Sequence, residues 1–362
     1  MRDRSIDELL AGYNPDTPLT EACTPPSAWY RDQDFANEET RRVFAGGWQM
    51  IARREQLQNH GDYITAEIAG EPVIVVRDGE LRAFYNVCRH HAARVVDSDA
   101  GSTRALHCPY HGWTYSLDGS LRSAPNFSAA DDFDMAEHGL RPVRVAQWER
   151  WVFVCLDDQA SDLPGWLGSL NTRLEPLCLD RLEFHQRVSY EINCNWKVYV
   201  DNYLDGGYHV PFLHRELDST LDSSRYLVET ADRYCLQSCP TSNAVSPAAS
   251  VRGGDMALYY WLFPNLMINW YEGLMDVNLV LPNGVGRCVV HFDYYFSGQS
   301  DAFKKDSMAV AHRVQLEDMA ICESVQKGLA SRSYDVGRLS PAKEAGEQFF
   351  HRLLHGSLSS RA

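Results

Sequence analysis

Long apolar segments are missing from this chain. No run approaches the roughly 18 consecutive apolar residues that a membrane-spanning helix needs. The first residues, MRDRSIDELLAGYN, lack the apolar core of a secretory signal and the Arg- and Ser-rich, acid-poor character of a transit peptide. The sequence therefore predicts a cytoplasmic protein with no membrane partner.

Basic residues are also scarce. The 362 residues include 34 Lys and Arg against 49 Asp and Glu, a formal net charge of -15. Nucleic acid binding takes a clustered basic surface, so we expect no nucleic acid partner. The acidity is compatible with a cationic substrate, although solubility alone accounts for the charge of most acidic proteins. The net charge alone therefore does not identify the substrate class.

Cysteines are comparatively numerous, ten in all, but a cytosolic chain is not expected to join them in a disulfide framework. Two of them, Cys88 and Cys108, stand close to histidines and are candidate metal ligands. The others are expected to be small buried hydrophobic residues: Cys23, Cys155, Cys178, Cys194, Cys235, Cys239, Cys288 and Cys322.

The pattern along the chain changes several times. Residues 34–47 read as a short amphipathic helix that ends at paired glycines. From 48 to 157, β-rich runs such as EPVIVV and RWVFVCL alternate with turn signals such as RDGE, which predicts an all-β module. A second β-rich region follows a Pro- and Gly-containing connection, and residues 301–330 have helical periodicity. The predicted inner face of this helix is Met308, Val310, Val314, Met319, Ile321, Val325 and Leu329. Two domains of an α+β fold are the coarse prediction.

The first candidate metal site combines Cys88-Arg-His90 with Cys108-Pro-Tyr-His111. Two thiolates and two imidazoles could hold a tetrahedral zinc. Each half, however, supplies one sulfur and one nitrogen, and the segments FYNVCRHHAARV and LHCPYHGWTYSLDG closely resemble the two loops of Rieske proteins. There, two cysteines bind one iron and two histidines the other iron of a [2Fe–2S] cluster. His91 is expected to be a surface residue, and many Rieske relatives have Arg-Gly where this chain has His91-Ala92.

The second candidate metal site lies in DNYLDGGYHVPFLH, residues 201–214. His209 and His214 follow a flexible segment with two glycines and suit two ligands of a 2-His-1-carboxylate iron site. Such a site leaves coordination positions open for O2 and substrate. A pair of histidines is often structural, but a Rieske cluster needs an electron acceptor. The third ligand must come from a distant carboxylate, and QLEDMAICESVQKGL offers Glu317, Asp318 and Glu323.

From about Phe35 to about Leu329, the chain resembles the α subunits of Rieske non-haem iron oxygenases, and among them the choline monooxygenases. The closer likeness lies in TPPSAWY (24–30), NCNWKVYVDNYLDGGYHVPFLH (193–214) and FPNLMINWYEGLMDVNLVLP (263–282). The resemblance implies an α+β protein with an N-terminal β-sandwich Rieske [2Fe-2S] domain and a helix-grip (START-like) catalytic domain with an antiparallel sheet. The expected divisions are an N-terminal helical segment (1–47) that packs on the catalytic domain, the Rieske domain (48–157) and the catalytic domain with its mononuclear Fe(II) (158–362).

The resemblance also implies roles for single residues. The third iron ligand is expected to be Asp318, with Glu317 as the alternative and Glu323 on a solvated face. An acidic residue of the family links an iron histidine to a cluster histidine of a neighbouring subunit, because the two metal centres of one chain are too far apart. Most relatives have this acid three residues before the first iron histidine, where this chain has Gly206. Choline monooxygenases share that arrangement, so Asp205 is the expected bridge and Asp201 the alternative.

The implied reaction is a monooxygenation. Electrons from NAD(P)H would arrive through a separate ferredoxin or flavin/iron–sulfur reductase, and the oxygenase would be a homo-oligomer, usually a trimer. The substrate would be choline, giving betaine aldehyde hydrate, or a related N-methyl ammonium compound that is N-demethylated. An aromatic cage for the cation is predicted from Tyr259, Trp261, Phe263, Trp270 and Tyr271, although alternating aromatics in strands are more often core. Asp276 or Glu272 could add negative charge.

Three other functions remain open from the sequence. An aromatic-ring hydroxylating or O-demethylating Rieske oxygenase would keep both metal centres and lack a cation cage. An electron-transfer Rieske protein would lack the mononuclear iron. A zinc-binding interaction module would contain neither iron nor sulfide.

Overall fold

The structure is a computed structural model that describes residues 5–128, 130–242 and 249–359. The chain divides into two compact units, Thr40–Trp166 and the combination of Met1–Glu39 with Leu167–Ala362. Within the described ranges, no helix combines the length and the apolar character needed to cross a membrane.

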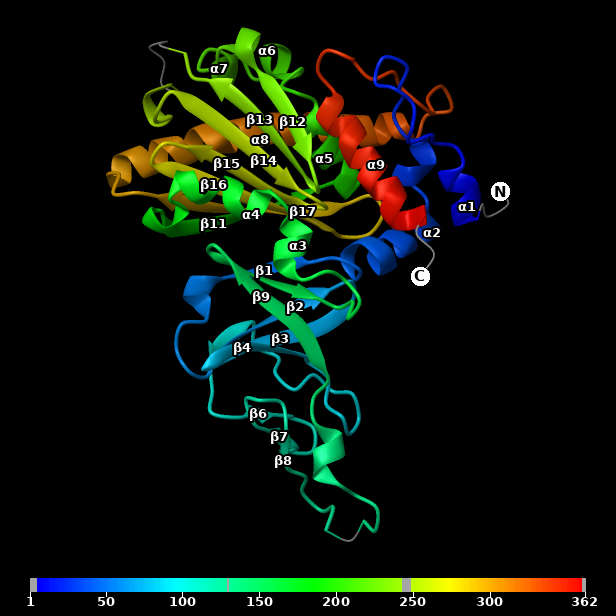
Figure 1. The fold of residues 1–362 in the computed structure, drawn as a ribbon, viewed down its shortest axis with the longest axis vertical. Helices are drawn as coiled ribbons and strands as arrows, with labels where there is room; N and C mark the ends of the chain where they lie inside the picture. Colours follow the sequence, from blue (N-terminus) through cyan, green and yellow to red (C-terminus); the bar gives the residue numbers. More distant parts are fainter. Residues whose placement is uncertain (1–4, 129, 243–248, 360–362) are drawn as a thin grey trace. The chain divides into compact units, whose positions relative to one another are not determined.

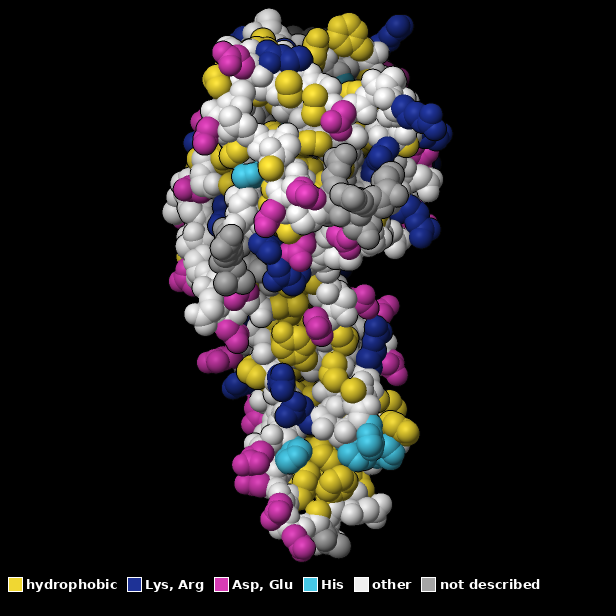
Figure 2. Space-filling view, turned by 90° about the vertical axis from the view of Figure 1, so that its right-hand side faces the viewer, with side chains coloured by type: hydrophobic (Ala, Val, Ile, Leu, Met, Phe, Trp, Pro, Cys, Tyr) yellow, Lys and Arg dark blue, Asp and Glu magenta, His cyan; other side chains and the backbone are white. Residues whose placement is uncertain are grey.

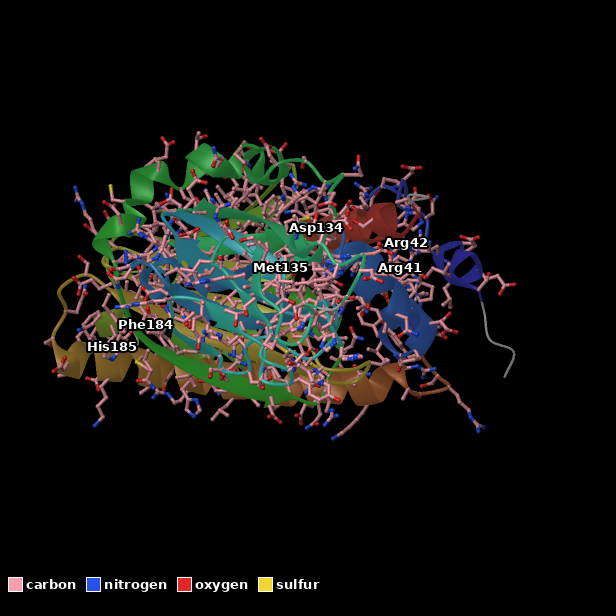
Figure 3. All side chains as sticks on the ribbon, turned by 90° about the horizontal axis from the view of Figure 1, so that it is seen from below. Arg41, Arg42, Asp134, Met135, Phe184 and His185 are labelled. Carbon is pink, nitrogen blue, oxygen red and sulfur yellow. The ribbon has the colours of Figure 1, made fainter. Side chains whose placement is uncertain are left out.

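The unit Thr40–Trp166 is built on β-strands. It starts in a π-helical turn, η2 (Glu39–Phe44), which contains Arg41 and Arg42 (Figure 3). Its main sheet has the order β1-β10-β9-β4-β3-β2-β5. The strands are β1 (Gln49–Arg53), β2 (Asp62–Ile68), β3 (Glu71–Asp78), β4 (Glu80–Tyr85), β5 (Ala100–Ser102), β9 (Pro142–Trp148) and β10 (Trp151–Cys155). A small sheet of β6 (Leu106–His107), β7 (Thr114–Tyr115) and β8 (Leu121–Ser123) adjoins it (Figure 1).

Strand β3 explains why the run EPVIVV is apolar without alternation. Val73 and Val75 pack with Val152 and Val154 of β10 in one core, so the sheet folds over on itself. Ile74 and Val76 point to the opposite side and belong to a second core, which also contains Cys88, Cys108, Trp113 and Tyr115. A strand buried on both faces needs apolar residues at every position. The second core attaches the candidate metal loops to the sheet.

The larger unit contains an antiparallel sheet with the order β11-β17-β16-β15-β14-β13-β12. Its strands are β11 (Glu183–Ile192), β12 (Leu227–Ala231), β13 (Tyr234–Pro240), β14 (Met256–Leu262), β15 (Leu266–Tyr271), β16 (Leu274–Pro282) and β17 (Cys288–Phe296). The pairing of β11 with β17 shifts by one residue between Phe184 and Gln186, so His185 has no partner in the ladder (Figure 3). This sheet forms the floor of the site described below.

Helices cover this sheet (Figure 1). Helix α5 (Trp196–Leu204) packs against β16, against the long α8 (Asp301–Leu329) and against α9 (Ala345–Ser359). The other helices of the larger unit include α1 (Ile6–Leu10), α2 (Gln33–Glu38), α4 (Leu170–Arg173), α6 (Val210–Leu213) and α7 (Arg215–Asp218), whereas α3 (Leu163–Leu167) begins in the unit Thr40–Trp166. The architecture confirms the predicted α+β fold of a β domain and an antiparallel sheet with a long helix.

The predicted inner face of α8 is only partly correct. Val310 and Leu329 are buried, whereas Ile321 and Val325 are 38% and 44% exposed. Smaller or polar residues occupy the contact with α5 instead. Gln315 accepts a hydrogen bond from Tyr199 (2.6 Å), and Cys322 lies 3.9 Å from the carbonyl oxygen of Val198. Close packing of two helices excludes large side chains from this contact, and hydrophobic periodicity does not contain that information.

A buried ion pair ties the N-terminal segment to α5. The ammonium group of Lys197 lies 2.7 Å from the carboxylate of Glu39, and these side chains are 1% and 2% exposed. The indole of Trp196 donates a second contact to Glu39 (3.3 Å). Burial raises the pKa of Glu39 and lowers the pKa of Lys197, and each partner opposes the shift of the other. The pair fixes the helix that positions the second candidate metal site.

Candidate metal centres and substrate cavity

The four candidate cluster ligands come from two tight turns at the base of the small sheet. In the first, the amide of Cys88 donates to Ala93 (2.8 Å) and the amide of Ala92 donates to Cys88 (3.0 Å). In the second, the amide of Cys108 donates to Trp113 (2.8 Å). Both cysteines are buried. The backbone turns therefore direct two thiols inward at equivalent positions.

The imidazoles of the two turns lie close together. The rings of His90 and His111 are 4.6 Å apart, and His90 stacks on Trp113 with a centroid distance of 4.9 Å. Histidine side chains gather at the surface of this unit (Figure 2). Among the described residues, the buried Nδ1 of His90 has no hydrogen-bond partner, as expected of an atom that ligates a metal. Partial burial and the neighbouring imidazoles of His91 and His111 lower the pKa of His90, which favours the neutral form that binds iron.

The presence of His91-Ala92, where many Rieske relatives have Arg-Gly, affects the backbone of the first turn. Ala92 has a φ of 59°, in the left-handed region that glycine adopts without steric cost. The glycine that many Rieske relatives have at this position is therefore the residue that the turn favours. His91 is exposed and packs beside Tyr110 at a ring distance of 6.2 Å. The departure leaves the turn intact.

The second candidate centre brings together His209, His214 and Asp318. The ligand atoms of the three residues lie within 4.8 Å of one another. The Oδ1 atom of Asp318 is 2.9 Å from Nε2 of His214 and 3.9 Å from Nε2 of His209. Asn202 of α5 donates to the same oxygen (2.8 Å) and holds the carboxylate in place. Two imidazoles and one carboxylate on one side of a site suit a non-haem iron with open positions.

The outer nitrogens of both histidines are held by other carboxylates. Nδ1 of His209 donates to Asp205 and Nδ1 of His214 donates to Glu317, each at 2.6 Å. These bonds select the tautomer whose Nε2 lone pair faces Asp318, as is usual for metal-binding histidines. Burial lowers the pKa of His214, but Asp318 and Glu317 raise it overall. The geometry thus places Glu317 behind His214 and Asp318 at the ligand position.

A pair of glycines explains why the acid stands at 205. Gly206 and Gly207 have φ values of 68° and 69°. A Cβ at Gly206 would lie 2.1 Å from the carbonyl oxygen of Lys343, so no side chain fits at the position three before His209. Asp205 instead accepts hydrogen bonds from the amides of Tyr208 (3.1 Å) and His209 (2.9 Å). The turn therefore lets the carboxylate of Asp205, four residues before His209, reach the imidazole that an acid three residues before it contacts in most relatives.

The alternative bridge, Asp201, has other partners. It accepts a hydrogen bond from Tyr30 (2.7 Å) and lies 2.9 Å from Nε2 of His351. Glu347 stands 4.0 Å from the same nitrogen, and burial raises its pKa well above the ordinary value. Asp201 lies on α5, four residues before Asp205, which follows the end of this helix, but no contact joins Asp201 to an iron histidine among the described residues. Glu323, the other acid of α8, accepts from the amide and side chain of Asn193 (3.1 and 2.9 Å).

A cavity opens beside the three candidate iron ligands, all of which line it. Its floor is a row of side chains across neighbouring strands, paired as Gln237 with Tyr259, Tyr259 with Asn269 and Asn269 with Asp276. The buried carboxylate of Asp276 accepts hydrogen bonds from Asn269 (2.7 Å) and Asn278 (3.0 Å). Burial raises its pKa, which the two amide donors and Arg252 oppose.

The predicted aromatic cage is only partly present. Tyr259 and Tyr271 line the cavity, and their hydroxyl groups are 2.5 Å apart. Trp261 and Phe263 lie in the core, where Trp261 packs against Phe350 of α9 (5.4 Å). Trp270 points to the opposite face of β15 from Tyr271 and is not in the wall of the cavity. Alternation of residues along a strand identifies the side chains that share one face of the sheet. It does not identify which helix covers each end of that face.

Several cavity residues went unnoticed in the sequence. They are Tyr199, Asn202, Tyr203, Tyr226, Gln237, Arg252, Asn269, Asn278, Phe292 and Gln315. Asn269 and Asn278 had a detectable signal, since buried strands of apolar residues rarely contain amides without a reason. Arg252 follows the short η8 (Ala249–Val251) and carries no periodic signal. Asp276 lies in the wall, whereas Glu272 is exposed and does not.

The chain is similar to known proteins over most of its length. Residues 47–146 match the model of the Rieske [2Fe-2S] domain, and residues 179–359 match the ring hydroxylating alpha subunit (catalytic domain). The chain is 41% identical to the chloroplastic choline monooxygenase of Arabidopsis thaliana, over 98% of this chain and 87% of the plant protein. The chain belongs to the Rieske oxygenase α subunits. Members of this family carry a Rieske [2Fe–2S] cluster and a catalytic mononuclear iron.

Other relatives of this Rieske oxygenase include the carnitine monooxygenase oxygenase subunit of Escherichia coli (strain K12), 32% identical over 92% of this chain and 93% of the relative. Among solved structures, the quaternary ammonium Rieske monooxygenase CntA in complex with L-carnitine superposes with a TM-score of 0.83 at 29% identity. That match covers 98% of this chain and 99% of CntA. Naphthalene 1,2-dioxygenase, with a TM-score of 0.78 and 21% identity over 96% of this chain and 95% of the dioxygenase, shares the fold.

Proposed function

We propose that this Rieske oxygenase is a monooxygenase of a quaternary or N-methyl ammonium compound. One oxygen atom of O2 enters a C–H bond, and the other leaves as water after two electrons and two protons are supplied. With choline the product is betaine aldehyde hydrate, and with an N-methyl substrate the hydroxylated methyl leaves as formaldehyde. The observation that carries the proposal is a cavity that combines the candidate iron ligands with the buried carboxylate of Asp276.

The chain's own residues fit the two metal groups of the family. Cys88, His90, Cys108 and His111 would hold the cluster, which supplies electrons. His209, His214 and Asp318 would hold the mononuclear iron, at which O2 is activated. Asp205 and Glu317 keep the imidazoles in the ligating tautomer, and Asn202 holds the carboxylate of Asp318.

The cation is proposed to lie among tyrosines above Asp276. Tyr199, Tyr203, Tyr226 and Tyr259 line the cavity, and burial raises the pKa of each well above the ordinary value. These side chains therefore stay neutral and offer aromatic faces to an ammonium group. The named activities of the plant and bacterial relatives, on choline and carnitine, support the same substrate class.

A substrate panel tests this proposal. The purified protein, reduced anaerobically, is mixed with O2 and separately with choline, glycine betaine, L-carnitine and aromatic carboxylic acids. We expect product only with an ammonium compound, and assays of both formaldehyde and aldehyde identify the carbon attacked. Turnover of an aromatic acid without turnover of any ammonium compound would favour the ring-hydroxylating alternative.

We further propose that Asp205 contacts a cluster histidine of a second subunit. Asp205 lines a second cavity of this unit, together with the exposed Ile321 and Val325 of α8. In the Rieske unit, Tyr110 beside His111 is 64% exposed. Such exposed apolar side chains are suited to burial in an interface. A homo-oligomer, expected to be a trimer, would bring the two surfaces together, as the inter-subunit electron transfer described for a quaternary ammonium Rieske monooxygenase suggests.

Replacement of Asp205 by asparagine tests this contact. We expect reoxidation of the reduced cluster by O2 and substrate to slow by about 10- to 100-fold, because a carboxylate that orients a metal histidine is lost. Stopped-flow absorbance of the cluster measures the rate, and iron content should stay nearly constant. Asp201→Asn is the matched control, four residues earlier on α5. A larger effect of Asp201→Asn than of Asp205→Asn would assign the bridge to Asp201.

The electron donor and the location also belong to the proposal. Electrons from NAD(P)H would reach the cluster through a separate ferredoxin or flavin/iron–sulfur reductase. The cytoplasm remains the predicted location, although the plant relatives are named as chloroplastic proteins.

A further inference from the structure

Arg252 places a positive charge in the cavity that otherwise suits a cation. Its side chain lines the same cavity as His209, His214 and Asp318. The guanidinium carbon lies 4.8 Å from the ring centroid of Tyr271, so the group rests on an aromatic face. That face of Tyr271 is consequently occupied and cannot also receive an ammonium group.

The Nε donor of the Arg252 guanidinium group is unpaired. Among the described residues, the buried Nε of Arg252 has no hydrogen-bond partner. Asp276 already accepts from Asn269 and Asn278. Burial lowers the pKa of Arg252, but Tyr271 and Asp276 raise it overall, so the group keeps its charge. A buried charged donor without an acceptor is unfavourable, and the planar guanidinium suits a carboxylate in two-point contact.

The cavity thus contains one buried anion and one cation with an unpaired donor. Choline has an ammonium group but no anionic group, so it would leave Arg252 without a partner and would be repelled by it. A zwitterion with an ammonium group and a carboxylate satisfies both Asp276 and Arg252. We propose that the substrate is a betaine-like zwitterion whose carboxylate is bound by Arg252. This inference rests on the function proposed above.

The carbons bound to the ammonium nitrogen of such a zwitterion are the candidates for oxidation. A zwitterion of this kind presents N-methyl groups. Hydroxylation of one methyl takes O2, two electrons from the reductase and two protons, and it gives a carbinol on nitrogen and water. The C–N bond then breaks, the electron pair returns to nitrogen, and a tertiary amine, formaldehyde and a proton are released. Attack on a methyl group is therefore an N-demethylation, and release of formaldehyde identifies it.

Binding to the anaerobic ferrous protein tests the assignment directly. Calorimetry compares glycine betaine and L-carnitine with choline and with the methyl ester of glycine betaine, which keeps the ammonium group and lacks the negative charge. We expect at least one of the two zwitterions to bind the wild-type protein about 10- to 100-fold more tightly than choline does, and glycine betaine to bind more tightly than its ester. This comparison needs no variant, so it does not depend on the folding of one.

Two variants of Arg252 complete the test. Arg252→Gln is expected to weaken binding of the preferred zwitterion by about 10- to 100-fold and to leave choline binding equal or stronger. Arg252→Lys should recover part of the loss, because it restores the charge without the two-point geometry. The matched control is Arg287→Gln, which removes the same charge at an exposed position between β16 and β17.

The outcomes separate the two proposals. Choline that binds as tightly as both zwitterions, with no change in Arg252→Gln, would overturn the role of Arg252 while the monooxygenase of ammonium compounds still stands. A wild-type protein that oxidises none of the ammonium compounds, yet oxidises another substrate, would overturn the proposed function itself and this inference with it.

Discussion

Replacement of Asp318 by alanine is expected to remove the mononuclear iron while the [2Fe–2S] cluster stays in place. Asp318 is the carboxylate on which Nε2 of both His209 and His214 converge. Two imidazoles alone leave the site without its anionic ligand. Iron content should fall from about three to about two atoms per chain. Turnover should fall by at least about 10³-fold, since activation of O2 at the metal is worth several kcal/mol.

The neighbouring acid provides the control for this variant. Glu317→Gln changes the residue next to Asp318 on the same helix and affects only the outer nitrogen of His214. We expect it to retain iron and to lower activity by about 10- to 100-fold. An unchanged EPR signal of the reduced cluster would show that the Rieske unit is intact, and an unchanged calorimetric midpoint of the larger unit would show that both variants keep the fold of that unit. Loss of iron from Glu317→Gln and its retention in Asp318→Ala would exchange the roles of the two acids.

Replacement of Lys197 by methionine is expected to destabilise the larger unit by about 3–5 kcal/mol. The change leaves the carboxylate of Glu39 buried without its counter-charge, which costs more than the pair contributes. Differential scanning calorimetry should show the midpoint of this unit lowered by about 6–20 °C, at the 2–4 °C per kcal/mol usual for this size. Iron occupancy should fall as well, because α5 carries Asn202 and precedes Asp205.

A double variant distinguishes charge burial from packing. Lys197→Met combined with Glu39→Leu removes both charges, and we expect most of the lost stability to return. A single Lys197→Met variant with stability within about 1 kcal/mol of the wild type would show that the buried charge is compensated in another way.

The metal ligands differ in how far the sequence could predict them. The spacing within each cysteine–histidine turn, and between His209 and His214, is local, so the pattern alone indicated these candidates. Asp318 is 104 residues from His214, and only resemblance to a family selected it over Glu317. The structure supplies the reason, because a helix presents neighbouring residues at different angles and only Asp318 faces both Nε2 atoms.

The substrate residues show where sequence reasoning ends. Tyr259 and Trp261 share one face of β14, yet the first borders the cavity and the second meets Phe350 of α9. The period of a strand cannot distinguish these two environments. Arg252 follows an irregular segment, and only the folded chain brings it to Asp276. Likewise, Ile321 and Val325 fit a helical inner face in the sequence but remain exposed beside Asp205.

The floor and the roof of the cavity come from different kinds of structure. The reactive centre is assembled by helices and the turns between them, whereas Gln237, Asn269 and Asp276 project from adjacent strands of one sheet. Gln237 also accepts a hydrogen bond from the amide of Gly206 (3.1 Å), so it supports the turn next to Asp205, whereas the side chain of Asp276 contacts, in the part of the chain that the structure describes, only Asn269 and Asn278 of the sheet by hydrogen bonds. We therefore expect a designer to alter the accepted molecule with least effect on the iron site by changing Asp276 rather than Gln237.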